Sequence, residues 1–197
     1  MPGERGPKVH TSAVVLIPPE RVWGPIQAIR RDHDPKVRRW MPHVTLLYPF
    51  VPEGMFGRVA ERLAEAICGT APFEVRLAEF RCFDHGRRSA TLWLRPEPVE
   101  AFKALQARLQ KAVPWCDDVS RHRGGFTPHL SVGRFLGGAA AKRAASGFLG
   151  AWRPLAFLAD HVSLIARSGA PGEPFSERMR VGFTGQIEVL TRRGGMV

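Results

Sequence analysis

Two segments of this 197-residue chain, almost half its length apart, share one residue pattern, and that repeat limits the possible folds more than any other feature. Met41–Tyr48 reads MPHVTLLY and Thr127–Arg134 reads TPHLSVGR, so each contains proline, histidine, an apolar residue and a hydroxyl residue in that order. The two histidines, His43 and His129, are 86 residues apart (129 minus 43). Each segment follows a loop and is typical of a strand that precedes a helix, which indicates one structural unit used twice.

The spacing of apolar residues predicts alternating strands and helices along the rest of the chain. Alternating or β-branched segments predict strands at 9–17, 43–48, 73–83, 89–94, 127–133, 154–158, 161–166 and 179–189. Apolar residues at helical spacing predict helices at 20–32, 55–68, 97–112 and 139–149. This order is typical of an α+β fold with largely antiparallel sheets and helices packed on their outer faces.

The strongly basic composition points to an anionic partner. The chain has 29 Lys and Arg against 18 Asp and Glu, which gives a formal net charge of +11. This charge favours RNA or nucleotides as the partner, although plain solubility explains it as well. The sequence has no G-x-G-x-x-G and no P-loop pattern, so nothing supports a cradle for a dinucleotide or a nucleoside triphosphate.

Other features bear on size, location and cofactors. The length suits one compact domain or two small lobes that share a cleft. No apolar run reaches about 18 residues and the first ten residues lack a secretory signal, so we expect no membrane span and a cytoplasmic protein. The cysteines Cys68, Cys82 and Cys116 have no C-x-x-C spacing, which argues against disulfides and a thiolate zinc site. We expect reduced thiols, no metal and no cofactor.

The repeated motif carries the groups needed for phosphorus chemistry. Residues i and i+2 of a strand point to the same face, so His43 projects with Thr45, and His129 with Ser131. If the two strands lie side by side across a cleft, two imidazoles and two hydroxyls converge. One imidazole can then act as base and the other as acid, while the hydroxyls hold phosphate oxygens. The predicted site is complete for transphosphorylation or hydrolysis without a metal.

The bare tripeptide is a weak signal, because His-x-Thr/Ser occurs four times in the chain. The other two matches begin at His10 and His161. Only His43 and His129 share the preceding proline, the apolar flanks and a basic loop just upstream. We interpret His10 and His161 as structural, and take the two proline-histidine motifs as the candidate site.

The two motif segments resemble those of a known family. MPHVTLLYPF and FTPHLSVGRF are similar to the two signature strands of the two-histidine (2H) phosphoesterase superfamily, which includes 2′-5′ RNA ligase-like proteins and cyclic nucleotide phosphodiesterases. The resemblance covers about residues 9–189. One departure is Ser131, where threonine is commoner in the family, and it keeps the hydroxyl.

The resemblance implies a bilobal fold with pseudo-twofold symmetry, in which each lobe is an antiparallel sheet backed by helices and the cleft between the lobes carries the motifs. It implies a single domain, 1–197, made of two intertwined lobes. Members of the family cleave 2′,3′-cyclic phosphates or 2′,5′ linkages, trim RNA ends, join RNA through 2′,5′ bonds, or only bind nucleotides. No protein partner is inferred, and we expect a monomer.

Several residues near the motifs are candidates for binding the substrate. On a regular strand, residue i+5 from each motif histidine faces away from the histidine, although Pro49 could turn Tyr48 back. Each candidate also has an ordinary structural interpretation, as a core aromatic or a solvated loop side chain. Phe83 is more typical of the core, and Asp117-Asp118 is interpreted as a turn or helix cap. The substrate-binding candidates are Tyr48, Arg134, Arg39, Trp40 and Phe126.

Three hypotheses for the function follow. The first is a metal-independent phosphodiesterase that acts on 2′,3′-cyclic phosphates, 2′,5′-linked nucleotides or RNA ends. The second is a nucleotide- or RNA-binding module of the same fold with little turnover, or a 2′-5′ RNA ligase. The third is a metal-dependent hydrolase with the histidines as ligands, against which no Asp or Glu stands near either motif.

Overall fold

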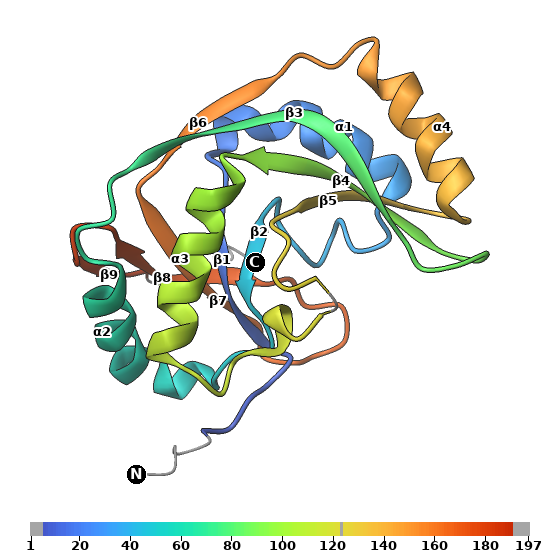
Figure 1. Cartoon of the computed structure of the whole chain (residues 1–197). Helices are drawn as coiled ribbons and strands as arrows, with labels where there is room; N and C mark the ends of the chain where they lie inside the picture. Colours follow the sequence, from blue (N-terminus) through green and yellow to red (C-terminus); the bar gives the residue numbers. More distant parts are fainter. Residues whose placement is uncertain (1–5, 123, 191–197) are drawn as a thin grey trace, which may run out of the picture.

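The computed structural model describes residues 6–122 and 124–190, which form two antiparallel β-sheets with helices packed against them (Figure 1). The first sheet has the strand order β2-β1-β7-β8-β9, and the second has the order β5-β4-β3-β6. The strands of the first sheet are β1 (Ser12–Leu16), β2 (Val44–Leu47), β7 (His161–Ala166), β8 (Ser176–Gly182) and β9 (Ile187–Val189). Those of the second are β3 (Phe73–Asp84), β4 (Ala90–Glu97), β5 (Leu130–Phe135) and β6 (Leu155–Ala159). The predicted α+β class is confirmed.

The helices connect the two sheets as well as covering them. α1 and α4 pack against the second sheet, and α2 packs against β8 and β9 of the first. α1 follows β1 of the first sheet but packs on β5, while α3 follows β4 of the second sheet but contacts β2. The two lobes therefore share one buried core. The helices are α1 (Trp23–His33), α2 (Phe56–Ile67), α3 (Val99–Ala112) and α4 (Gly138–Leu149), with short 3-10 helices at Glu20–Val22, Glu53–Met55 and Asp118–Ser120.

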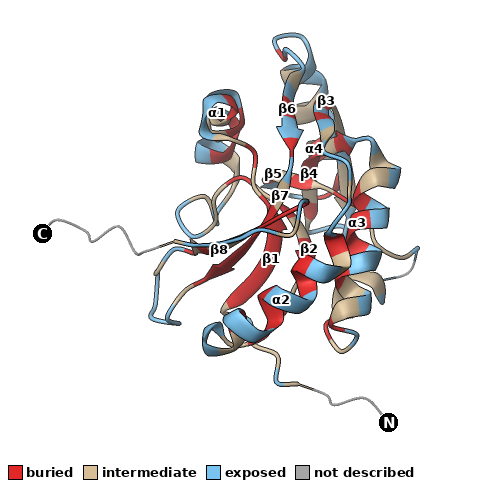
Figure 2. Cartoon of the chain, turned by 90° about the vertical axis from the view of Figure 1, so that its left-hand side faces the viewer, coloured by how far each residue is buried: buried red, intermediate tan, exposed pale blue. Residues whose placement is uncertain are grey.

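α2 shows how the sequence pattern produces this packing. Phe56, Val59, Leu63 and Ile67 recur at helical spacing, and all four are buried against the core (Figure 2). The helix ends at the glycine that the sequence indicated. Gly69 takes a φ of +77°, a conformation that favours glycine. Its N–H donates to the carbonyl oxygen of Phe183, just after β8, at 3.0 Å.

The end of the chain differs from the prediction. The segment 179–189 was expected to be one strand, but it forms the end of β8, a turn, and β9. Gly185 adopts a φ of +89° in that turn, and the Gly182 N–H donates to the carbonyl oxygen of Gln186 at 2.9 Å. The two glycines were a turn signal that the apolar pattern hid. The first strand is also shorter than predicted, since Val9 forms only an isolated bridge with Phe50.

The two motif strands occupy equivalent places in the fold. β2 is one edge strand of the first sheet, and β5 is one edge strand of the second. The two strands contact one another where the lobes meet (Figure 1). The predicted bilobal arrangement, with a sheet and helices in each lobe, is confirmed. The two motif histidines are 86 residues apart in sequence (129 minus 43), yet their strands come to lie side by side.

Candidate active site

Alternation on the two motif strands separates the motif side chains from the core. Val44 and Leu46 are fully buried, whereas His43 and Thr45 are only partly buried. The second motif repeats this pattern, with buried Leu130 and Val132 flanking Ser131, and His129 partly buried. A strand has a side-chain period of two, so the apolar residues anchor each strand and turn the polar pair to the opposite face. The burial pattern thus places the polar pair of each motif on one face of its own strand.

The two imidazoles are held in the same way. Nδ1 of His43 lies 2.7 Å from the carbonyl oxygen of Met41, and Nδ1 of His129 lies 2.8 Å from the carbonyl oxygen of Thr127. In each case the acceptor is two residues earlier, across a proline that biases its predecessor toward extended backbone. A neutral ring must donate from Nδ1 to form this bond, which leaves the lone pair on Nε2. Both rings therefore present Nε2 for proton transfer.

Burial keeps both rings neutral at ordinary pH. Burial lowers the pKa of His43 to about 4, helped by the positive charges of Arg30 and His129 and opposed by the hydrogen bond to Met41. Burial likewise lowers the pKa of His129, with a contribution from His122. Because the charge of His129 lowers the pKa of His43, a charged imidazole at one position disfavours charge at the other. The site therefore accepts one proton more readily than two.

Aromatic rings support both histidines. Trp40 stacks on His43 with centroids 4.8 Å apart and planes at 21°, and it also stacks on Phe175 with centroids 3.8 Å apart. Phe83 meets His129 edge-on at 5.0 Å, and Trp93 of β4 lies at 6.0 Å. Trp40, a candidate for substrate binding, packs beside the imidazole of His43. Such contacts restrict the rotation of each imidazole ring and fix its orientation.

A buried arginine fixes the loop that carries Trp40. The side chain of Arg30, on α1, is 3% exposed and pairs with Asp34 at 2.9 Å. Its guanidinium also donates to the carbonyl oxygen of Trp40 at 2.8 Å and to Gln27 at 3.0 Å. The sequence reasoning missed Arg30. Its only sequence signal was the i, i+4 spacing to Asp34 on a predicted helix.

Both motif strands contain a β-bulge at the same place, one residue after the hydroxyl. Thr45 pairs with Val15 while Leu47 pairs with Val14, so β2 has one extra residue there. In β5, Ser131 pairs with Trp93 and Gly133 with Leu92. An extra residue reverses the alternation beyond it. The residues at i+5 from the histidines consequently return to the motif face.

This corrects the expectation that Tyr48 and Arg134 face away. Arg134 pairs with Thr91, and Thr91 shares a face of β4 with Trp93, the partner of Ser131. Tyr48 likewise packs with Ala13 and Val15, on the Thr45 side of the first sheet. Regular-strand geometry gave the wrong side because a bulge has no clear signature in a single sequence. Tyr48 and Arg134 hold equivalent positions in the two lobes.

The surroundings of Tyr48 are aromatic and basic. Its hydroxyl donates to the carbonyl oxygen of His10 at 3.3 Å, and its ring meets those of His10 at 5.4 Å and Trp40 at 5.6 Å. Burial raises the pKa of Tyr48, against the lowering effect of the nearby charges of Arg167 and Arg39. His10 thus lies beside the first motif, packed against Tyr48, and Arg39 lies near the same ring.

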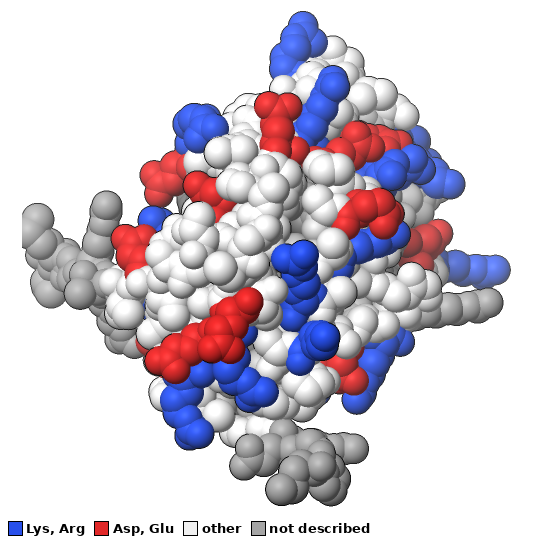
Figure 3. Space-filling view, turned by 60° about the vertical axis from the view of Figure 1, so that its left-hand side comes forward, with Lys and Arg blue, Asp and Glu red and all other residues white. Residues whose placement is uncertain are grey.

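The remaining candidates lie elsewhere. Phe126 packs against the main core. His161, in β7, bonds through Nδ1 to the Asp160 carboxylate at 2.5 Å and lines a different pocket, with Arg180. Asp117 and its neighbour begin a 3-10 helix and form ion pairs with Lys8, so the expected turn is confirmed there. Basic side chains do not form a continuous patch on the face drawn in Figure 3, where acidic ones lie between them.

The described part of the chain offers neither a clustered metal-ligand set nor a membrane-spanning helix. In residues 6–122 and 124–190 no group of three or more His, Cys, Asp and Glu side chains is placed to hold a metal ion. Within the same residues, no helix combines the length and the apolar character needed to cross a bilayer.

Comparison with known proteins agrees with the fold and identifies the family. A protein of Geobacillus kaustophilus whose name gives phosphoesterase as its provisional class is 27% identical over 127 residues, which cover 64% of this chain and 70% of that protein. Among solved structures, TT0787 of Thermus thermophilus superposes with a TM-score of 0.60 at 20% identity, covering 89% of this chain and 99% of that one.

Escherichia coli LigT, solved in complex with 3′-AMP, gives a TM-score of 0.57 at 19% identity, with 89% of this chain and 98% of that one covered. These two structures share the fold with this chain. The family model of the 2′-5′ RNA ligase superfamily matches residues 18–171. That match covers more than half of the chain and includes both motif strands, so the protein belongs to the 2′-5′ RNA ligase superfamily.

Proposed function

We propose that the protein is a metal-independent phosphodiesterase that hydrolyses 2′,3′-cyclic phosphates or 2′,5′ linkages in nucleotides or at RNA ends. The observation that carries the proposal is the matched geometry of His43 and His129. Each ring donates from Nδ1 to a carbonyl oxygen two residues earlier, and each therefore keeps Nε2 as its proton acceptor. Two separate packing roles give no reason for the same tautomer and the same backbone acceptor in both lobes.

The proposed reaction follows from this arrangement. Nε2 of one neutral imidazole takes a proton from water, whose oxygen forms a new bond to phosphorus. The bond from phosphorus to the ribose 2′ or 3′ oxygen breaks, and the second imidazole, protonated at Nε2, gives its proton to that oxygen. Thr45 and Ser131 donate to the phosphate oxygens and hold the group in line. The negative phosphate raises the pKa of a nearby imidazole and so supplies the protonated ring that burial alone opposes.

The aromatic and basic lining suits a nucleotide. Tyr48, on the motif face, offers a ring on which a base can stack, and Arg39 near it offers a cation for a phosphate. The net charge of +11 favours the approach of a polyanion. We also propose that the protein is cytoplasmic and monomeric, and that residues 1–197 form one domain of two intertwined lobes. The crossing of α1 and α3 between the sheets supports the intertwining of the two lobes.

Turnover of 2′,3′-cyclic AMP, with and without EDTA, tests the proposal. We expect hydrolysis that survives EDTA and falls by about 10²- to 10⁴-fold in His43→Ala and in His129→Ala, since each removes a general acid or base. His161→Ala is the matched control, because His161 begins the same His-x-Ser tripeptide but lines another pocket. Full activity in either motif variant would refute the proposal.

The same assay separates the other functions. Tight binding of 3′-AMP without turnover of any cyclic phosphate or 2′,5′-linked dimer indicates a binding module. Loss of activity with EDTA indicates a metal-dependent hydrolase. Joining of RNA ends through a 2′,5′ bond in the presence of a cyclic phosphate end indicates the ligase reaction, which uses the same two histidines with a ribose hydroxyl in place of water.

A further inference from the structure

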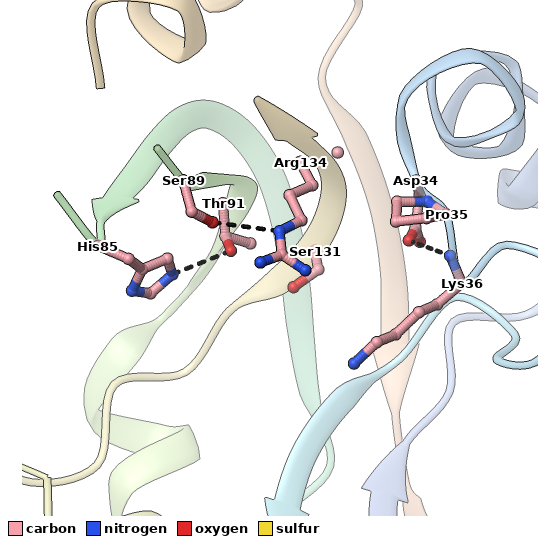
Figure 4. Close-up of a pocket in the computed structure, with 9 residues that line it drawn as sticks. Asp34, Pro35, Lys36, His85, Ser89, Thr91, Ser131 and Arg134 are labelled. Atoms are coloured by element: carbon pink, nitrogen blue, oxygen red, sulfur yellow. Dashed lines mark hydrogen bonds between the residues drawn. The ribbon is translucent and has the colours of Figure 1, made fainter. Parts of the chain in front are cut away.

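A pocket of about 210 Å³ opens beside Ser131, and the chemistry of the two histidines makes no use of it (Figure 4). It lies between the loop that follows α1 and the hairpin that joins β3 to β4. Lys36 reaches toward it from the loop, and Arg134 projects from β5 (Figure 4). Ser89, Thr91 and Ser131 add three hydroxyls to its wall. Two cations from different parts of the chain thus share one polar pocket.

The positive charge of the pocket is not neutralised within the protein. In residues 6–122 and 124–190, no carboxylate lies within ion-pair distance of Lys36 or Arg134. The one acidic residue in the wall, Asp34, is engaged by Arg30 at 2.9 Å and accepts the backbone N–H of Lys36 at 2.8 Å. An unpaired arginine and lysine beside hydroxyl donors are the groups that bind a phosphate.

Hydrogen bonds among the residues around the pocket hold its walls in place. The Arg134 Nε–H donates to the Ser89 hydroxyl at 3.1 Å, so two of the guanidinium nitrogens remain to meet an anion. Nε2 of His85 lies 3.1 Å from the Thr91 hydroxyl. The backbone N–H groups of Arg39 and Trp40 both donate to the Lys36 carbonyl oxygen, at 2.9 and 3.0 Å, which fixes the loop beneath the lysine. Such preorganisation lowers the entropic cost of binding.

The pocket extends along β5 from Ser131 to Arg134, away from the place proposed for the reacting phosphate, and Ser131 borders both. Because β5 has an extra residue at its bulge, Arg134 lies two pairing positions beyond Ser131, opposite Thr91 and Trp93 of β4 respectively, which is about 7 Å along the strand. A single phosphate held between the motif side chains therefore does not fill it. We propose, building on the proposed function, that this pocket binds a second phosphate of the substrate, and that the substrate class is an oligoribonucleotide end and not a nucleoside cyclic monophosphate.

Binding measured by calorimetry tests the subsite without requiring turnover. The probes are 3′-AMP, adenosine 3′,5′-bisphosphate, and the diadenosine dinucleotide that ends in a 3′-phosphate. We expect the wild type to bind the dinucleotide about tenfold more tightly than 3′-AMP, as one additional charge-assisted contact provides. In Lys36→Gln that ratio should fall close to one. In Lys103→Gln, which removes an equal charge from the exposed face of α3, it should stay at the wild-type value.

The dependence on salt gives a second readout. Salt screens the attraction between a lysine and a phosphate, so each such contact makes affinity fall more steeply with salt concentration. The affinity for the dinucleotide should therefore fall less steeply with salt in Lys36→Gln than in Lys103→Gln. An equal gain from adenosine 3′,5′-bisphosphate and from the dinucleotide supports a second-phosphate subsite whose source is a terminal phosphate. A gain from the dinucleotide alone supports an internucleotide phosphate.

Two outcomes would overturn the subsite. One is equal affinity of the wild type for all three probes, and the other is a Lys36→Gln variant that weakens all three by the same factor. Failure of the proposed function is distinguishable, because it leaves the affinity ratio and its loss in Lys36→Gln intact while no cyclic phosphate is hydrolysed. Circular dichroism of each variant shows that the fold is retained, as expected for an exposed loop residue.

Discussion

Replacing His43 by Asn tests whether the folded protein holds this imidazole in its neutral form. Burial lowers the pKa of His43 from about 6.5 in an unfolded chain to about 4. Between these values the unfolded chain binds a proton that the folded protein does not. Stability from the neutral ring is therefore fully present above pH 6.5 and is lost progressively as the pH falls toward 4.

The size of the effect follows from the shift in pKa. One unit corresponds to about 1.4 kcal/mol, so a fall from 6.5 to about 4 sets an upper limit of about 3 kcal/mol. The ring is partly exposed, and water screens part of its burial, so we expect about 2 kcal/mol. Asn has no proton to gain in this range. The free-energy difference between wild type and His43→Asn should therefore shrink by about 2 kcal/mol between pH 7.5 and 4.5.

Urea denaturation of both proteins at several pH values measures this difference directly. Carboxylates and the other histidines titrate in both proteins, so their contributions largely cancel in the subtraction. A difference that stays constant within about 0.5 kcal/mol from pH 7.5 to 4.5 would refute the reasoning, because it would mean that the imidazole protonates as readily in the folded state as in the unfolded chain.

Three further predictions concern the residues that support the site and the pH dependence of the reaction. Arg30→Met should lower the free energy of unfolding by about 3 to 5 kcal/mol, since it leaves Asp34 without its buried partner, and a variant as stable as the wild type by urea denaturation would contradict this. Gly133→Ala should lower it by about 1 to 3 kcal/mol, since a Cβ there would lie 2.8 Å from the Cβ of His33; a melting temperature equal to that of the wild type would show that the bulge can yield. The kcat/KM of cyclic phosphate hydrolysis, which reports the pKa values of the free enzyme, should be bell-shaped in pH with its maximum below pH 6.5, because burial lowers the pKa of both motif histidines; a flat profile between about pH 5 and 8 would argue against paired histidines.

Much of the fold could be predicted because local patterns carry it. The stripe of α2, its end at Gly69 and the alternation of the two motif strands each arise from residues close in sequence. The repeat then indicated that two strands would play equivalent roles. The division of 179–189 into two strands was missed, because the apolar pattern continued through a glycine turn.

The supports of the site could not be predicted in the same way. Trp93 lies beside His129 only because β4 pairs with β5, and Phe175 lies on Trp40 only because β8 begins near the first motif. Arg30 acts through the carbonyl oxygen of Trp40. Each of these contacts joins segments whose proximity is a property of the folded chain.

The sequence by itself determined that two polar pairs, His43 with Thr45 and His129 with Ser131, would face one way, because the period of a strand is a local property of the backbone. The tertiary structure alone decided which neighbours share that face. A bulge in each motif strand reverses the alternation and brings Tyr48 and Arg134 to the motif side. A bulge depends on how two strands pair, and pairing is set by contacts between segments far apart in the chain.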